Sequence, residues 1–234
     1  MLILGIDTSA LAASAAVLKD GKLISECYIN TGLTHSQTIM MLIDNCLKNA
    51  NLSFSEIDAV AVAKGPGSFT GIRIGVSAVK GLCFAEDKPC MGVSTLEALA
   101  YCVNDEDCLI CPVMDARCKQ VYCALFEKDN GEISRILDDS AIALADLYDI
   151  LIKFEDKRIV FIGDGTDISY DYFCAKGLNV KKFSEIFKYQ HASGVAIAAF
   201  NNYNKGEEFI SSDKLLPSYL RLSQAERELN KTGG

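Results

Sequence analysis

The 234-residue chain has no tryptophan, only two histidines and no excess of positive charge. Its 23 Lys and Arg residues stand against 31 Asp and Glu residues, so the formal net charge is −8. This deficit argues against a broad binding surface for nucleic acid or for an anionic membrane. The two histidines, His35 and His191, are far apart in the sequence and neither has a second ligand at helical spacing, so we predict no metal site.

The chain also lacks the long apolar run of a membrane span and the signals of a secretory leader. No run approaches the roughly twenty apolar residues that a spanning helix requires. The N-terminus MLILGIDTS has neither a basic region nor a cleavage site. The ten cysteines are scattered through apolar segments and do not form a disulfide framework. We therefore expect a cytoplasmic protein without membrane contact, whose buried thiols are free.

Hydrophobic periodicity predicts two successive α/β units. In the first, Asp20-Gly21 separates two strand-like runs and predicts a hairpin, because both central residues of a type I′ turn adopt positive φ. Asn130-Gly131 gives the second unit the same signal. The other predicted elements are strands over 2–6, 57–63, 90–92, 109–115, 158–165 and 178–182, and helices over 36–50, 70–86, 94–102, 143–153, 169–175 and 191–204.

The repeated order of strand, hairpin, helix, strand and helix predicts an α/β fold with two duplicated subdomains, in which helices flank mixed β-sheets. The charged stretch 103–108 marks the boundary, so we expect subdomains over 1–104 and 105–234. We expect the C-terminal tail to be able to pack back on the first subdomain. A ligand would bind at the carboxyl ends of the strands, where Asp7, Gly65 and Asp115 are expected to converge.

Asp7, Thr8 and Ser9 follow the first strand, and two interpretations of them are open. They could hold a hydrated magnesium ion and present hydroxyls to a phosphate. Equally, Asp7 and Ser9 could form a local turn by bonding the backbone. Asp115 ends the corresponding strand of the second unit, and with Arg117 it is expected at the edge of the cleft as an ion pair or a turn.

The segment KGPGSFTGIRIG, residues 64–75, lies between a buried strand and a predicted helix. Lys64, Gly65, Gly67 and Ser68 could surround an anion at the N-terminus of that helix. The segment fails the Walker pattern, because no Lys-Ser or Lys-Thr follows its last glycine. The alternative is a tight turn at Pro66-Gly67 with Ser68 or Thr70 as the helix cap, and the local pattern favours this alternative.

Both predicted helices of the first unit carry more apolar surface than one face of a sheet can cover. In helix 70–86, Arg73, Ser77 and Lys80 form one narrow polar stripe, while Gly71 and Gly75 lie on a track that would admit a close neighbour. We predict a partner-binding surface made of Ile39, Met40, Ile43, Leu47, Gly71, Ile72, Arg73, Gly75, Val76, Val79 and Lys80. The alternative is that the second subdomain covers both helices.

Six segments occur in order over nearly the whole chain: GIDTS (5–9), HSQ (35–37), KGPGSFTGIRIGVSAVKGL (64–82), GVSTLEALA (92–100), PVMDARCKQVYCALF (112–126) and LPSYLRLSQAE (216–226). Together they resemble the bacterial TsaB (YeaZ) family. The resemblance implies an actin-like ATPase (ASKHA) fold with two duplicated subdomains. It also implies a paralogue, TsaD, which transfers a threonylcarbamoyl group to N6 of adenosine 37 in tRNAs that read ANN codons.

The resemblance further implies an accessory subunit without catalytic residues of its own. TsaB proteins dimerise with TsaD through the two helices of the first subdomain, and the ATPase TsaE joins them. TsaD holds a metal with an HxxxH motif, whereas the corresponding stretch here, HSQTI, has His35 followed by Ile39 in the second position. The glycine-rich second phosphate motif of active relatives is replaced by DARCKQ.

From this resemblance we expect no cofactor on the isolated chain, ATP or ADP with magnesium at most at the partner interface, and a homodimer when the chain is alone. Contact with tRNA is expected only through the complex. A hypothesis from another class is a phosphotransferase of the sugar-kinase type acting alone, motivated by Asp7 and the glycine-rich loop. A peptidase has less support, because no metal pair or nucleophile constellation is present.

Overall fold

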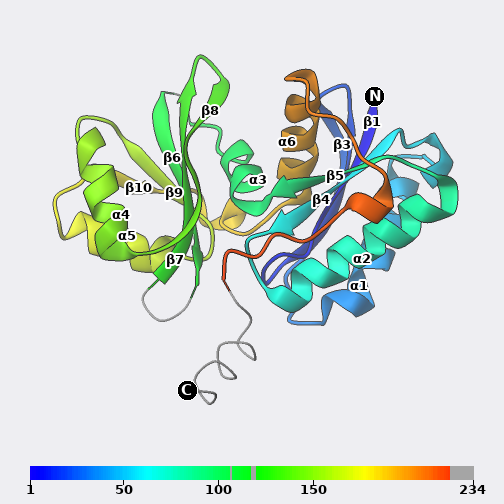
Figure 1. The fold of residues 1–234 in the computed structure, drawn as a ribbon, viewed down its shortest axis with the longest axis horizontal. Helices are drawn as coiled ribbons and strands as arrows, with labels where there is room; N and C mark the ends of the chain where they lie inside the picture. Colours follow the sequence, from blue (N-terminus) through cyan, green and yellow to red (C-terminus); the bar gives the residue numbers. More distant parts are fainter. Residues whose placement is uncertain (106, 117–119, 222–234) are drawn as a thin grey trace.

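The computed structural model describes residues 1–105, 107–116 and 120–221, and among them it contains two five-stranded β-sheets (Figure 1). The first sheet has the order β3-β2-β1-β4-β5. Strand β2 is antiparallel to both of its neighbours, β1 and β3, whereas β4 and β5 run parallel to β1, so the sheet is mixed. Its strands are β1 (Leu2–Asp7), β2 (Ala13–Lys19), β3 (Lys22–Ile29), β4 (Ala59–Gly65) and β5 (Cys90–Ser94).

The second sheet has the order β10-β9-β6-β7-β8. This order is the same as that of the first sheet when β6, β7, β8, β9 and β10 are matched in turn to β1, β2, β3, β4 and β5. The pairing directions repeat as well, with β6–β7 and β7–β8 antiparallel and β6–β9 and β9–β10 parallel. The predicted duplication is therefore confirmed. The strands are β6 (Cys108–Asp115), β7 (Gln120–Asp129), β8 (Glu132–Ala143), β9 (Ile159–Ile162) and β10 (Val180–Lys182).

Both predicted hairpins are present and have the expected backbone. Asp20 and Gly21 have φ values of 48° and 79°, and Asn130 and Gly131 have 50° and 81°. Positive φ at both central residues is the requirement of a type I′ turn, whose twist matches that of the flanking strands. The two Asx-Gly signals thus set the register of the antiparallel edge of each sheet.

Helices cover the sheets on both faces. Alternating side chains of β1 divide between two cores, since Leu4 and Ile6 pack with helices α1 and α2 while Ile3 packs with α6 on the opposite face. The helices are α1 (His35–Asn49), α2 (Phe69–Glu86), α3 (Thr95–Tyr101), α4 (Leu144–Leu151), α5 (Thr166–Cys174) and α6 (Ala192–Asn204). Short 3₁₀ turns are η1 (Phe54–Glu56), η2 (Ile152–Phe154), η3 (Glu185–Phe187) and η4 (Ser212–Lys214).

The division expected at residue 104 separates the strands of the two sheets, but two helices cross it. Helix α6 comes after the second sheet in the chain and packs on the first sheet. Helix α3 comes before the second sheet and packs against it through Leu96 and Leu99. The two helices lie against each other between the sheets, so the halves share a junction (Figure 1).

The segment after α6 returns along the first half, and we call residues 207–221 the C-terminal strap. Its Ile210 pairs with Cys90 of β5 through two backbone hydrogen bonds of 2.8 Å. Leu215 is only 1% exposed and belongs to the core beneath α2. In Figure 1 the strap runs beside α2 and then turns toward the second half.

Candidate functional site

The carboxylate of Asp7 lies at the carboxyl end of β1 and is completely buried. The backbone N–H and the hydroxyl of Ser9 donate to its Oδ1 at 2.8 and 2.7 Å. Its Oδ2 has no hydrogen-bond partner among the described residues. Burial raises the pKa of Asp7 to about 6, against the lowering effects of the Ser9 hydrogen bonds and of His35 and His191. This geometry matches the local-turn interpretation of residues 7–9.

The glycine-rich segment packs directly on this turn. The Ser68 N–H donates to the Ser9 carbonyl at 2.7 Å, and a Cβ added to Gly67 would lie 2.3 Å from the same oxygen. The Thr8 hydroxyl donates to the carbonyl of Gly71 at 2.7 Å. The side chain of Ser68 caps α2, as predicted, by accepting from the Gly71 N–H. The glycines therefore serve the close approach of two backbone segments.

The C-terminal strap occupies the outer side of the glycine-rich segment. The N–H of Ser218 donates to the carbonyl of Lys64 at 2.7 Å. Gly65 has a φ of 123°, and a Cβ there would lie 2.2 Å from the carbonyl oxygen of Ser218. A ligand that bound at this part of the loop would have to displace Ser218 of the strap.

In the second half, the corresponding aspartate has a different environment. Asp115 is exposed at the end of β6, and its backbone N–H donates to the carboxylate of Asp164 at 3.1 Å. Burial raises the pKa of Asp164. Asp164 lies between Gly163 and Gly165, in a GDG turn that sequence reasoning missed, although its position after β9 matches that of residues 65–68 after β4. Arg117 lies outside the described residues.

Each histidine has its own local role. His35 bonds the carbonyl of Ala10 at 2.7 Å through Nε2. His191 stacks on Tyr28 with ring centroids 4.6 Å apart, and its Nδ1 lies 3.4 Å from Glu26. Glu26 also accepts from the N–H of Ser193 in the first turn of α6. Within residues 1–105, 107–116 and 120–221, no group of three His, Cys, Asp or Glu side chains could hold a metal ion.

Most side chains predicted to contact a partner lie in the core of the first half. Most apolar residues of the two helices face their own sheet, where α1 packs on β2 and β3 and α2 packs on β4. The glycines also face inward, since a Cβ on Gly71 or Gly75 would lie 2.1 or 2.5 Å from atoms of Thr8. The buried members of the predicted surface are Ile39, Ile43, Leu47, Gly71, Ile72, Gly75, Val76 and Val79. Their assignment to a partner surface is corrected accordingly.

The polar stripe on α2 is used by the strap. The Lys80 ammonium donates to the carbonyls of Asp213 and Leu215 at 3.0 and 3.1 Å. Arg73 donates to the hydroxyl of Tyr219 at 2.8 Å, and the Tyr219 ring stacks on Phe69 at 4.5 Å. Part of the outer side of α2 is thus covered by the C-terminal strap; the sequence led us to expect that the tail could pack back on the first subdomain, but not that it would cover α2.

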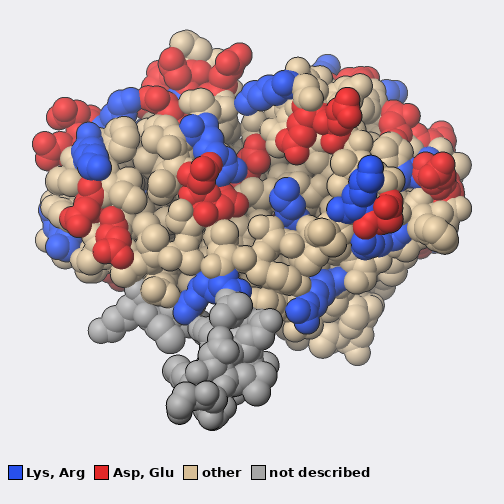
Figure 2. Space-filling model, viewed as in Figure 1, with Lys and Arg blue, Asp and Glu red and all other residues tan. Residues whose placement is uncertain are grey.

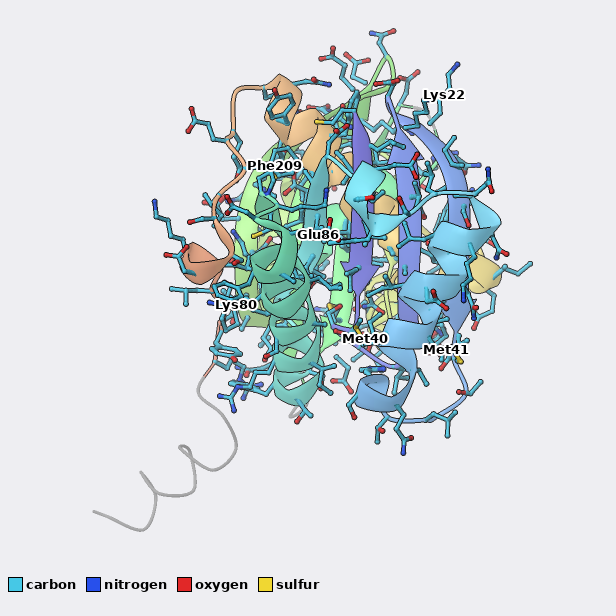
Figure 3. All side chains as sticks on the ribbon, turned by 90° about the vertical axis from the view of Figure 1, so that its right-hand side faces the viewer. Lys22, Met40, Met41, Lys80, Glu86 and Phe209 are labelled. Carbon is cyan, nitrogen blue, oxygen red and sulfur yellow. The ribbon has the colours of Figure 1, made fainter. Side chains whose placement is uncertain are left out.

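The remaining exposed surface of the two helices is mixed, and it includes several apolar side chains among polar ones. Met40 and Met41 are 49% and 53% exposed, and Figure 3 shows both on α1, with Met40 on the side nearer α2. On α2, Ile74, Ala78 and Leu82 are half-buried. We define the α1–α2 face by these five residues. Of the predicted contact residues, Met40 alone lies on it.

Comparison with known proteins identifies the family. The tRNA threonylcarbamoyladenosine biosynthesis protein TsaB of Bacillus subtilis is 34% identical to this chain over 97% of the chain and 96% of its own length. The chain belongs to the TsaB family. The TsaB protein of Escherichia coli is 34% identical over 57% of this chain and 58% of that protein.

Residues 30–229 also match the model of the family described as TsaD: tRNA N6-adenosine threonylcarbamoyltransferase, so the chain belongs to that family too. The transferase of Brachyspira hyodysenteriae is 29% identical over 79% of this chain and 62% of the transferase. Helices α1 and α2 both lie within the matched range. The TsaB family therefore shares its sequence pattern with an enzyme family.

Solved structures support the same assignment of the fold. YeaZ from Pseudomonas aeruginosa superimposes with a TM-score of 0.76 at 24% identity, over 94% of this chain and 99% of that chain. Component A of the (R)-2-hydroxyglutaryl-CoA dehydratase of Acidaminococcus fermentans gives a TM-score of 0.52 at 13% identity, over 87% of this chain and 99% of that chain. The predicted actin-like ATPase fold is confirmed. No helix in the described part of the chain is long and apolar enough to cross a membrane.

Proposed function

We propose that this protein is a non-catalytic subunit for threonylcarbamoyl modification of adenosine 37 in ANN-decoding tRNAs, which dimerises with TsaD, activates it and acts together with TsaE. The observation that carries the proposal is the TsaB likeness over 97% of the chain. Hydrogen bonds within the chain engage Oδ1 of Asp7 and Nε2 of His35, which supports a subunit that catalyses no reaction of its own.

The proposed binding surface for TsaD is the α1–α2 face. Methionine side chains adapt to a partner's shape, and an exposed apolar surface next to a protein's own core is a common feature of interfaces. TsaD-type proteins match this chain across α1 and α2, so the partner has helices of the same kind. Two such faces can pack around a pseudo-twofold axis, and the same face supports a homodimer when TsaD is absent.

The residues of this chain do not fit a magnesium nucleotide in the described conformation. Asp7 is completely buried, and its Oδ1 is engaged by Ser9. The carbonyl of Ser218 lies over Gly65. ATP or ADP with magnesium is therefore proposed to bind at the interface with TsaD and not on the isolated chain. The same contacts disfavour a phosphotransferase acting alone.

Contact with tRNA is proposed to come through the partners. The net charge of −8 opposes binding to a polyanion. On the face shown in Figure 2, basic and acidic side chains are interspersed and separated by uncharged surface. Two of the basic side chains near the glycine-rich segment, Arg73 and Lys80, are engaged by the C-terminal strap.

A reconstituted tRNA modification assay tests the proposal. The chain is titrated into a fixed amount of TsaD and TsaE with substrate tRNA, and the rate of modification is expected to rise and then saturate at a defined ratio to TsaD. A rate that is independent of the added chain would contradict the proposed role. Calorimetry with Mg-ATP on the isolated chain is expected to show no binding, whereas binding and turnover lost in Asp7→Ala would support the phosphotransferase.

A further inference from the structure

The two halves of the molecule meet at a close crossing of α3 and α6. A Cβ added to Gly194 of α6 would lie 2.3 Å from the carbonyl oxygen of Ala98 in α3 and 2.8 Å from the sulfur of Cys102. Small side chains thus line the crossing, and Ala98, Ala198 and Ala199 belong to one core cluster. Packed helices with small residues at their contact can slide on each other when two domains close or open.

Residues 210–218 of the C-terminal strap are attached to the first half. Ile210 pairs with β5, Lys80 holds the carbonyls of Asp213 and Leu215, and Ser218 bonds Lys64. The Leu215 side chain is buried in the first core. These contacts fix residues 210–218 relative to α2 whatever the position of the second half.

The last two described residues of the strap reach the second half. Leu220 packs against the cluster that contains Met114, Ala116 and Tyr122. The guanidinium of Arg221 donates to the carbonyl of Ala116. Ala116 follows Asp115 at the carboxyl end of β6, so this contact lies where a ligand of such a fold would enter between the halves. Ala10 of the first half packs on the same cluster, so the contact continues an existing junction.

We propose that Leu220 and Arg221 form a latch that holds the two halves closed at the carboxyl ends of their sheets, and that its release lets the halves separate at the α3–α6 crossing. The latch follows directly after the anchored residues 210–218 of the strap, and the second half is the moving part. The device does not depend on the proposed function, because it involves contacts within this chain only.

Cys102 supplies a probe of this opening. Its sulfur lies at the crossing, next to Gly194, and donates to the carbonyl of Ala98 at 3.4 Å. Burial raises the pKa of the Cys102 thiol to about 12, so the closed form contains almost no reactive thiolate at neutral pH. Residue Cys102 is half-buried in the closed form, and separation of the halves would expose its thiol further to water and to alkylating reagents. Cys174 is exposed on α5 and Cys111 is buried inside the second sheet, so these two thiols report reagent activity and unfolding.

The test is alkylation of the full chain with iodoacetamide, with the modification of each cysteine followed by mass spectrometry. In Arg221→Ala and in Leu220→Ser, Cys102 is expected to react about threefold to tenfold faster than in the wild type, the range that corresponds to one lost contact of hydrogen-bond strength. Leu216→Ser is the matched control, because Leu216 lies on the same strap and is 68% exposed. Cys174 and Cys111 are expected to react at unchanged rates.

An unchanged rate at Cys102 in both latch variants would overturn the proposal. An equal acceleration in Leu216→Ser would overturn it as well, because the effect would then not belong to the contact with Ala116. A parallel rise at Cys111 would assign the reactivity to unfolding of the second half and would also count against a latch.

Discussion

The two halves share one sheet topology but differ in their helices. In the first half α1 and α2 have 15 and 18 residues, whereas α4 and α5 of the second half have 8 and 9. At about 1.5 Å per residue, α2 is roughly 27 Å long, while the six-residue strand β1 spans about 20 Å. Helix α2 is thus longer than β1, and the two helices of the first half carry the exposed Met40, Met41 and Phe84.

The aspartates at the ends of the central strands differ in the same way. Asp7 is completely buried beneath the glycine-rich segment, while Asp115 is exposed and lies next to Asp164. The fold has thus been kept in both copies, while the chemical environment of the corresponding carboxylates has changed. In the first half the carboxylate supports a turn on which α2 begins.

The largest expected effect concerns the side chains of α2 that face the sheet. Ile72→Ala should lower the free energy of unfolding by about 2–5 kcal/mol, because Ile72 is completely buried and the substitution leaves a cavity. Met40→Ala, on the exposed side of α1, should change it by no more than about 0.5 kcal/mol. Urea denaturation measures both. Equal small effects would contradict the inward orientation of Ile72.

The pH dependence of stability tests the burial of Asp7. Its pKa is raised from 3.8 to about 6, so the folded state holds its proton more tightly than the unfolded state, and stability is lost as the pH rises from 3.8 through 6. Asp7→Asn keeps an acceptor for Ser9 without a charge. At pH 7 this variant should be more stable than the wild type by on the order of 3 kcal/mol, with the difference vanishing below pH 3.8.

Denaturation at pH 3.5, 5 and 7 would show this trend. Asp138→Asn, on the exposed part of β8, is the control and should follow the wild type at all three values. A variant that is less stable than the wild type at pH 7 would show that the charge of Asp7 contributes favourably, against this account of the first half.

The smallest expected changes in stability come from two glycine substitutions, one on the side of α2 that faces the sheet and one on the side that faces solvent. Gly71→Ala should destabilise the protein by about 1–3 kcal/mol, because the new Cβ would lie 2.1 Å from the Thr8 carbonyl oxygen. Gly81→Ala should stabilise it by about 0.5–1 kcal/mol, because the space around Gly81 is open and alanine favours the helix. Thermal unfolding of the pair measures both, and the same sign for both variants would contradict the orientation of α2.

The fold could be predicted from local signals, whereas the surfaces could not. Asp20-Gly21 and Asn130-Gly131 specify their hairpins through backbone conformation, and the helices were recognised from their apolar spacing. That spacing does not distinguish a helix side facing a sheet from one facing a partner. Ile72 and Val79 were therefore assigned to the wrong side.

The position of the strap over α2 was not predicted, because its contacts join residues more than 100 positions apart. Lys80 is linked to Asp213, and Arg73 to Tyr219, by hydrogen bonds that leave no periodic pattern in an extended segment. Asp164 was missed because its GDG turn matches the glycine-rich segment in position after a strand and not in sequence. Both examples depend on tertiary proximity, which short-range patterns do not encode.

The most direct test of the account is the affinity of this chain for TsaD, measured by calorimetry or interferometry with the purified proteins. Met40→Glu places a charge on the α1–α2 face and is expected to weaken binding by about a hundredfold, which corresponds to about 2.7 kcal/mol. Ile168→Glu is the matched control, because Ile168 is 45% exposed on α5 of the second half, and it should bind like the wild type. Unchanged binding by Met40→Glu, or an equal loss in Ile168→Glu, would contradict the assignment of the partner surface to the first half.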